Sequence, residues 1–411
     1  MNGLDLFPFP KHRLQKTDLD LAASLQGLVE KQVMDRRLEL KEDYEGLLKP
    51  SLGKLMAEIG LQKMFWPEKY GGDEHNQPAA SYTVAAALEQ IGRADVGLAF
   101  LAAHSLALQA ALALEDNYRE EQVAAVAPLF CEGNRPLIVS FVLPTLVEEE
   151  GAPEWRGKGF QVKAKGGAGG WTLNGKGVRP TCSGVDAGLF GVACAVEGED
   201  EPAFILVPGD APGLNRGAEF KKTGLAASRN ADLDLAGVQV PAAGCAWRGD
   251  AGFFKLLSWY YLGLTAAGVG ALLATYEILR EWGDNRVIKG RGHIFKDNPL
   301  TAALMGEIAK EVVVDRLLAY DLAGMLAEPD AYGGDGSQAL FTSALMLAHQ
   351  VMASAEYTIN RTMELMASAG YAKEWQLERH WRDIKTMQCH LAAYELATDD
   401  YARWHYSTNT L

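Results

Sequence analysis

Apolar positions recur at helical spacing along the first third of the chain. The runs LAASLQGLVEKQV and LLKPSLGKLMAEIGL place an apolar residue every three or four positions, which predicts two helices between residues 17 and 60, the second beginning after Pro50. FWPEKYGGDE at 65–74 is a turn-rich break, and the Ala- and Leu-rich stretch that starts at Tyr82 predicts a pair of buried helices. We therefore expect a helical domain over residues 1–135.

The pattern then changes to short runs of alternating apolar and polar residues. LIVSFVL, GFQVKAK, GWTLNGKGVR, GLFGVACAV, AFILVPG and DLDLAGVQVP are each bounded by Gly, Pro, Asn or Asp, as antiparallel strands joined by tight turns are. The pair Asn174-Gly175 predicts a two-residue hairpin turn. A small antiparallel β-barrel or sandwich is expected over residues 136–248.

Long helical patterns return after this β domain. The run that starts at Phe253 is apolar on nearly all sides, which indicates a helix buried in the core or at a subunit interface. EPDAYGGDGS at 328–337 is the clearest helix break. We expect helices at 253–286, 299–328, 337–367 and 376–408. Residues 249–411 should thus form a helical bundle, which gives an α+β multidomain fold of helices, β domain and helices.

Composition and charge exclude several classes of function. The chain has 39 Lys and Arg against 53 Asp and Glu, a net charge of −14, which opposes binding to nucleic acid or anionic lipid. No segment approaches the roughly 18 uninterrupted apolar residues of a membrane span. The N-terminus lacks a basic region followed by a continuous apolar one, so we expect a cytoplasmic protein. The five cysteines are scattered without a CxxC pair, which predicts neither disulfides nor a metal site.

The sequence contains none of the common phosphate-binding or nucleophile motifs. GGAGG at 166–170 and GVG at 268–270 match neither GxGxxG nor a P-loop, and GVG is better explained by close helix packing. No GxSxG nucleophile elbow is present. Because His104 lies in an apolar helical run, we interpret it as a core histidine whose ring nitrogens are hydrogen-bonded. His390 lies near the C-terminus beside a charged segment, and its role is left open.

Four segments in order resemble signatures of the acyl-CoA dehydrogenase family: GLQKMFWPEKYGG, WTLNGKGVRPT, KTGLAASRNADLDLAGVQVP and ASAGYAKEWQLERHWRDIK. The resemblance extends over residues 20–405 and agrees with the layout of helices, β domain and helices. It implies an FAD held between subunits and an acyl-CoA thioester on the other face of the flavin. It also implies an electron-transfer flavoprotein or another electron acceptor, and an oligomer formed with copies of the chain or with a homologue.

The resemblance raises a problem at the catalytic base. In the family a carboxylate removes the α-proton of the thioester while hydride passes to the flavin. When the chain is aligned on the RDxKxxQ run at 382–388, the family glutamate falls at Leu391. The alternative base position, on the long buried helix, falls at Tyr260, a phenol whose ordinary pKa near 10 makes it a poor base. Asp95 and His390 are candidates for a relocated base.

The flavin-binding signatures also depart from the family pattern. An acidic stretch, LPTLVEEEG at 143–151, replaces the family's TEPxxGSD, and the tryptophan of the family's WIT motif becomes arginine. The family's QxxGG reads ELMAS at 364–368, and the aromatic that follows the family's arginine is Lys289. The resemblance nevertheless implies cofactor contacts, so we expect FAD with reduced affinity or none. The implied contact residues are Phe141, Leu143, Arg179, Thr181 and Arg286.

Three functions remain open from the sequence. The preferred one is an FAD-dependent oxidoreductase that acts on the CH–CH group of an acyl thioester with an atypical or relocated base. The second is a catalytically degenerate subunit that pairs with an intact homologue. The third is a flavin-dependent monooxygenase of the same superfamily, which needs no α-carbon base. Leu391, Tyr260 and Tyr261 would narrow the acyl site and favour a short or ring-bearing substrate.

Overall fold

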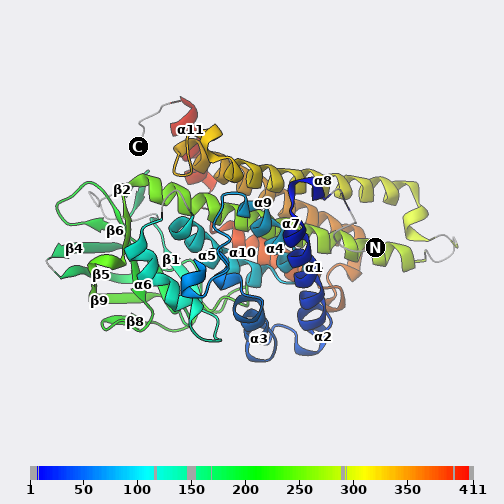
Figure 1. Ribbon diagram of the computed structural model, residues 1–411. Coiled ribbons are helices and arrows are strands. Elements are labelled where there is room, and N and C mark those ends of the chain that lie inside the picture. Colours follow the sequence, from blue (N-terminus) through cyan, green and yellow to red (C-terminus); the bar gives the residue numbers. More distant parts are fainter. Residues whose placement is uncertain are drawn as a thin grey trace.

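A computed structural model describes residues 7, 9–114, 118–145, 154–167, 169–287, 292, 294–391 and 394–406. It confirms the predicted order of a helical region, a β-sheet region and a helical bundle (Figure 1). The helices of the first region are α1 Lys16–Val29, α2 Arg37–Leu40, α3 Lys49–Gly53, α4 Ala80–Ala94, α5 Val96–Ala113 and α6 Glu120–Cys131.

The N-terminal region is built around the helix pair α4 and α5. Every residue of α5 is buried, which explains why its sequence is apolar on all sides. The two helices are separated by Asp95, whose carboxylate caps α5 by accepting a hydrogen bond of 2.8 Å from the backbone N–H of Leu98. The helix predicted after Pro50 begins at Lys49 and continues as a π-helical turn over Lys54–Glu58.

The β domain contains strands β1 Val139–Val142, β2 Glu154–Trp155, β3 Lys158–Gly159, β4 Val162–Gly167, β5 Gly170–Val178, β6 Leu189–Val196, β7 Ala203–Pro208, β8 Leu214–Arg216, β9 Leu233–Val240 and β10 Cys245–Arg248. Most of them pair in the order β10-β7-β6-β4-β5-β9-β8, with β1 beside β6. The pairings of β6 with β1 and with β4 are parallel, so the expectation of only antiparallel neighbours is wrong for these pairs. Long connections carry the chain back across the sheet there, which short turns cannot do.

The predicted hairpin turn at Asn174-Gly175 is also wrong. Both residues lie inside β5, where the register with β9 shifts on either side of them. The Asn174 side chain accepts a hydrogen bond of 2.8 Å from the Gly237 N–H on β9. A Cβ atom on Gly175 would lie 2.9 Å from the Gln161 carbonyl oxygen, so glycine serves close backbone approach at a bulge here.

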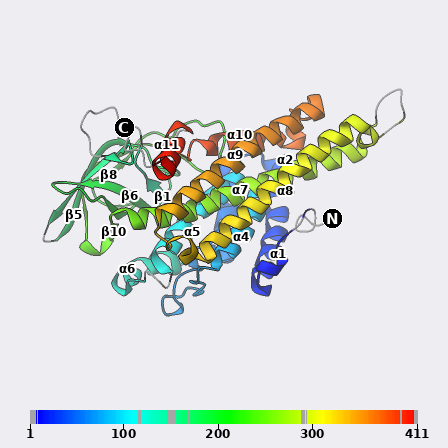
Figure 2. The same cartoon turned by 90° about the horizontal axis from the view of Figure 1, so that it is seen from above.

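The C-terminal bundle consists of α7 Asp250–Asn285, α8 Pro299–Ala327, α9 Gln338–Met366, α10 Leu377–Gln388 and α11 Tyr394–Tyr406. Helix α7 runs through the centre of the molecule and contacts α4, α5, α8 and α9 (Figure 2). A Cβ atom on Gly270 would lie 2.3 Å from the Glu89 carbonyl oxygen, which confirms that the GVG run allows close helix packing. The single helix predicted at 376–408 is two helices, because α10 ends at Gln388.

Helices α5 and α7 are long and apolar enough to cross a membrane by length and composition alone. However, 100% of the most apolar window of α5 and 83% of that of α7 are buried inside the fold. Since the other elements of the protein cover these windows, we interpret both as core helices of a globular fold.

Candidate active site

A cavity of about 280 Å³ lies between the β domain and the C-terminal bundle. Its walls come from the end of β1, the segments around β2, β3 and β5, the helices α7 and α9, and the two residues that follow α10. It is lined by Leu143, Pro144, Thr145, Trp155, Lys158, Gln161, Arg179, Pro180, Thr181, Asn230, Leu257, Tyr261, Phe341, Cys389 and His390. Three of the residues implied as flavin contacts, Leu143, Arg179 and Thr181, are therefore brought together, and His390 lies among the same lining residues.

The other candidate residues lie outside this lining. Phe141 is fully buried on β1, behind the cavity wall. Tyr260 and Leu391 are 0% and 1% exposed within the hydrophobic core, and the adjacent residues Tyr261 and His390 line the cavity in their place. Neighbouring residues of helix α7 point in different directions, so Tyr261 reaches the cavity and Tyr260 does not.

Thr181 is held by strand β1 and by helix α5, which lies behind the cavity wall. Its N–H donates to the Phe141 carbonyl oxygen at 2.7 Å, and the Phe141 N–H donates to the Thr181 hydroxyl oxygen at 3.1 Å. The hydroxyl also makes a hydrogen bond of 2.8 Å with Nε2 of His104 on α5. The other ring nitrogen of His104 lies 2.7 Å from the Phe100 carbonyl oxygen. The prediction of a hydrogen-bonded core histidine is confirmed, but its contact with Thr181 was not predicted.

An aromatic cluster behind the wall sets the protonation states there. The His104 ring lies 4.6 Å from Phe100, 5.0 Å from Phe141 and 4.8 Å from Tyr260, measured between ring centroids. Burial among these rings lowers the pKa of His104 to about 4. Burial also raises the pKa of Tyr260 well above its ordinary value, so the phenol stays protonated at neutral pH. Tyr260 is therefore no base in this structure.

His390 directly precedes the predicted base position, Leu391, in the sequence. It follows α10, lines the cavity, and packs on Phe100 with a ring-centroid distance of 4.7 Å. Burial, with the neighbouring His104 and the positive charge of Lys222 adding to it, lowers the pKa of His390 to about 3. The imidazole is neutral at physiological pH and has a lone pair that can accept a proton.

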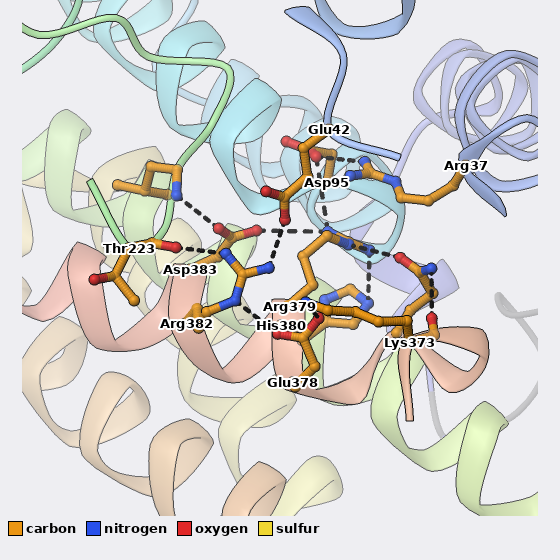
Figure 3. A network of polar contacts seen from close by, with 12 residues as sticks. Arg37, Glu42, Asp95, Thr223, Lys373, Glu378, Arg379, His380, Arg382 and Asp383 are labelled. Atoms are coloured by element: carbon orange, nitrogen blue, oxygen red, sulfur yellow. Dashed lines mark hydrogen bonds and ion pairs between the residues drawn. The ribbon is translucent and has the colours of Figure 1, made fainter. Parts of the chain in front are cut away.

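Asp95, the other candidate for a relocated base, belongs to a structural network (Figure 3). Its carboxylate lies 2.5 Å from Nη2 of Arg37 and 3.7 Å from Nη1 of Arg379, and it is 3% exposed. Burial alone would raise the pKa of Asp95, but the two guanidinium groups lower it below its usual value. The network continues to Asp383, which accepts a hydrogen bond from the Leu225 N–H at 2.6 Å. Asp95 thus connects α5 to α10, and the cavity lining does not include it.

Arg179 occupies the position where the family has tryptophan. Its guanidinium pairs with Asp232 at 2.9 Å and lies over the Phe220 ring at 4.8 Å, and its side chain is 66% exposed. Exposed pairs of this kind contribute little, so Arg179→Ala should change the free energy of unfolding by less than about 1 kcal/mol. Urea denaturation followed by circular dichroism would check this, and a larger loss would mean that Arg179 supports the cavity wall.

Arg286 lies far along α7 from the cavity lining. It is the residue that follows the last turn of α7, where its N–H donates to the Trp282 carbonyl oxygen at 2.9 Å, and it is exposed. Lys289 and residues 146–153, which include most of the acidic stretch, lie outside the described residues. In the segment that replaces QxxGG, Glu364 pairs with Arg361 at 2.9 Å.

Residues 15–134 match the acyl-CoA dehydrogenase N-terminal domain, and residues 262–395 match the acyl-CoA dehydrogenase C-terminal domain. This chain belongs to the acyl-CoA dehydrogenase family. It is thus a member of a family of flavoprotein oxidoreductases, which confirms the resemblance found in its sequence.

Individual acyl-CoA dehydrogenases resemble the chain along most of its length. The probable acyl-CoA dehydrogenase YngJ of Bacillus subtilis (strain 168) is 26% identical over 345 residues, 82% of this chain and 84% of that protein. The cyclohexane-1-carbonyl-CoA dehydrogenase of Syntrophus aciditrophicus (strain SB) is 25% identical over 380 residues, 90% of this chain and 92% of that protein.

Solved structures show the same fold. Butyryl-CoA dehydrogenase from Megasphaera elsdenii superposes with a TM-score of 0.78 at 20% identity, covering 94% of this chain and 97% of that chain. A glutaryl-CoA dehydrogenase from Mycobacterium smegmatis in complex with FADH2 gives a TM-score of 0.79 at 20% identity, covering 100% and 99% of the two chains. At these identities the superpositions establish the fold of this chain and not its substrate.

Proposed function

We propose that this chain is an FAD-dependent oxidoreductase that acts on the CH–CH group of an acyl thioester with an atypical base. The observation that carries the proposal is the composition of the cavity. One wall holds Leu143 and Thr181 of the β domain, where the family places its flavin. Opposite them, helix α7 contributes Tyr261 and the turn that follows α10 contributes His390. A site of this kind needs an electron sink on one side of the substrate and a proton acceptor on the other.

The residues present fit the ring of a flavin. Thr181 lines the cavity with a hydroxyl whose partners leave one lone pair unused, and the backbone at Leu143 lies beside it. At about 280 Å³ the cavity is close to the lower end of the roughly 300–1,000 Å³ of small-molecule sites, so it has room for a ring or an acyl group but not for both without opening. Bound FAD would supply the hydride acceptor. Arg286, exposed at the end of α7, would meet the pyrophosphate of an FAD held by a neighbouring subunit.

We assign the proton-accepting role to His390. The imidazole is neutral, lines the cavity, and precedes the family base position by one residue. Its pKa of about 3 makes it a weak base in the empty cavity. The negative charge that develops on the thioester as the α-proton leaves would favour the imidazolium form and raise this pKa during the reaction. Leu391 would remain a core residue.

His390→Phe should reduce the rate of flavin reduction by an acyl-CoA thioester by about 10²–10⁴-fold, the usual contribution of a general base. In the parent protein kcat/KM should stay flat from pH 5 to pH 7, because an imidazole with a pKa near 3 becomes protonated, and inactive, only in more acidic solution. Stopped-flow absorbance under anaerobic conditions measures both the rate of flavin reduction and its dependence on pH. Cys389→Ser, at the adjacent cavity position, is the matched control and should keep the parent rate. An unchanged rate in His390→Phe would remove this assignment.

The lining favours a compact acyl group. Trp155, Leu257, Tyr261 and Phe341 place large apolar side chains around the cavity. We propose a short or ring-bearing acyl-CoA as substrate, and the similarity to cyclohexane-1-carbonyl-CoA dehydrogenases supports a ring. A panel of short straight-chain and cyclic acyl-CoA thioesters, compared by flavin bleaching, would identify the preferred class.

Two kinds of protein partner follow from the proposal. The first is an electron-transfer flavoprotein or other acceptor that reoxidises the flavin. The second is another subunit of the same fold, from this chain or a homologue. Helices α8 and α9 carry large apolar side chains exposed to solvent, which support such an interface: Leu300, Val314, Leu317, Met346 and Tyr357. Light scattering after size-exclusion chromatography would give the number of copies.

A catalytically degenerate subunit is the second candidate function. Among the described residues that line the cavity there is no Asp or Glu, which favours this alternative. The two candidates differ in the absorption spectrum of the protein purified alone. A flavin spectrum that bleaches with an acyl-CoA thioester supports the enzyme. Colourless protein that gains flavin only when co-expressed with an intact homologue supports the degenerate subunit. Oxygen consumption with reduced flavin and no thioester would instead indicate the monooxygenase.

A further inference from the structure

The contacts of His104 define which of its ring nitrogens carries the proton. Nδ1 lies 2.7 Å from the Phe100 carbonyl oxygen, and a carbonyl oxygen can only accept a hydrogen bond. Nδ1 must therefore carry the hydrogen. Because burial keeps the ring neutral at pH 7, there is no second ring proton, and Nε2 has a lone pair. The sequence distance of 77 residues between His104 and Thr181 shows that this arrangement depends on the tertiary fold.

The protonation of His104 determines the direction of the hydrogen bond made by Thr181. A hydroxyl has one hydrogen to donate and two lone pairs to accept with. Since Nε2 of His104 can only accept at 2.8 Å, the Thr181 hydroxyl donates its hydrogen there. One lone pair accepts the Phe141 N–H at 3.1 Å. The Thr181 hydroxyl can therefore offer a molecule in the cavity one lone pair and no hydrogen.

We propose that His104 is a positioning residue that makes Thr181 a pure hydrogen-bond acceptor toward the cavity, so that the site prefers reduced over oxidised flavin. This inference rests on the proposed flavoprotein function. The ring nitrogen that receives hydride is a bare acceptor in oxidised flavin and carries an N–H in reduced flavin. If bound FAD places this nitrogen against the Thr181 hydroxyl, a bare nitrogen would gain no hydrogen bond from the remaining lone pair, whereas an N–H would donate one.

The surroundings of His104 and Thr181 strengthen the preference for reduced flavin. His104 is 0% exposed, and Phe100, Phe141 and Tyr260 surround its ring, so bulk water cannot supply an alternative acceptor for the Thr181 hydrogen on that side. Hydrogen bonds are stronger in such a low-dielectric environment. We expect the ratio of affinities for reduced and oxidised flavin to change by about tenfold, which is about 30 mV for a two-electron couple.

Two variants of His104 separate this positioning role from a purely structural one. His104→Leu removes the acceptor and frees the Thr181 hydrogen for the cavity, and His104→Gln keeps an acceptor oxygen on the side chain. The midpoint potential of the bound FAD, measured by spectroelectrochemical titration, should fall by about 30 mV in His104→Leu. It should stay near the parent value in His104→Gln. A purely structural role would change stability in both variants and leave the potential unmoved.

Nitrogen NMR of the His104 ring in the cofactor-free protein tests the premise without any flavin. The expected spectrum shows a protonated Nδ1 and an unprotonated, hydrogen-bonded Nε2. A protonated Nε2 would overturn the inference even if the flavoprotein function holds. Equal midpoint potentials in the parent protein and His104→Leu would also overturn it and leave the proposed function intact. Failure to bind flavin in either redox state would rule out both the proposed function and the preference for reduced flavin.

Discussion

Replacing Glu89 with alanine should lower the free energy of unfolding by about 3–5 kcal/mol, the usual result of removing one partner of a buried ion pair. Glu89 on α4 and Arg316 on α8 are each 1% exposed. Two hydrogen bonds of 2.8 Å and 2.6 Å join the guanidinium to the carboxylate. Without Glu89 the Arg316 charge stays buried with its main partner removed, and this uncompensated charge is the source of the loss. Urea denaturation at pH 7 followed by circular dichroism measures it.

Two further variants make this test specific. The double variant Glu89→Leu with Arg316→Met should lose less than Glu89→Ala alone, because it removes both charges and their desolvation costs together. Glu45→Ala removes an exposed pair with Lys49 at 2.8 Å, and it should change the unfolding free energy by no more than about 0.5 kcal/mol. If Glu89→Ala resembles Glu45→Ala, the ion pair between α4 and α8 is accessible to water in solution.

Much of the fold could be predicted from the sequence because it depends on local periodicity. The apolar positions of α7, α8 and α9 recur along whole helices, so their positions were found within a few residues. The parallel pairings of β6 could not be predicted in this way, since they depend on which strands the long connections bring together. The pair Asn174-Gly175 shows the limit of a local turn signal, because the same two residues also suit a bulge inside a strand.

The candidate site shows the same division between local and tertiary information. Family resemblance predicted Leu143, Arg179 and Thr181 as flavin contacts, and all three line one cavity. It could not show that Tyr261 lines the cavity and Tyr260 packs in the core, because the orientation of α7 decides this. The contact of His104 with Thr181 had no sequence signal beyond a histidine in an apolar helix. The combination of a buried imidazole and a cavity-facing hydroxyl became visible only in three dimensions.

The sequence also gave no reason to single out Asp315, a carboxylate inside α8. Its side chain is 1% exposed, and neither carboxylate oxygen has a hydrogen-bond partner within the described part of the chain. Burial raises the pKa of Asp315 to about 7; the nearby Ser354 hydroxyl opposes this shift and the negative charge of Glu311 adds to it. Since an unfolded aspartate has a pKa of about 3.9, the unfolded state releases this proton at a lower pH than the folded state does.

Asp315→Asn should therefore gain stability relative to the parent protein as the pH rises. Below pH 4 the aspartate is protonated in both states and contributes no pH dependence. Between pH 4 and pH 7 the parent loses stability progressively, and above pH 7 the full penalty is on the order of 4 kcal/mol. Urea denaturation at pH 5 and pH 8 should show the advantage of Asp315→Asn growing by about 2–3 kcal/mol. The test is how much the stability difference between variant and parent grows from pH 5 to pH 8, because the desolvation of the asparagine amide is the same at both pH values.

Asp321→Asn, at an exposed position of the same helix, should show no such growth. An equal difference for Asp315→Asn at both pH values would show that Asp315 is ionised in the folded protein and has a partner, such as a neighbouring subunit, that stabilises its charge.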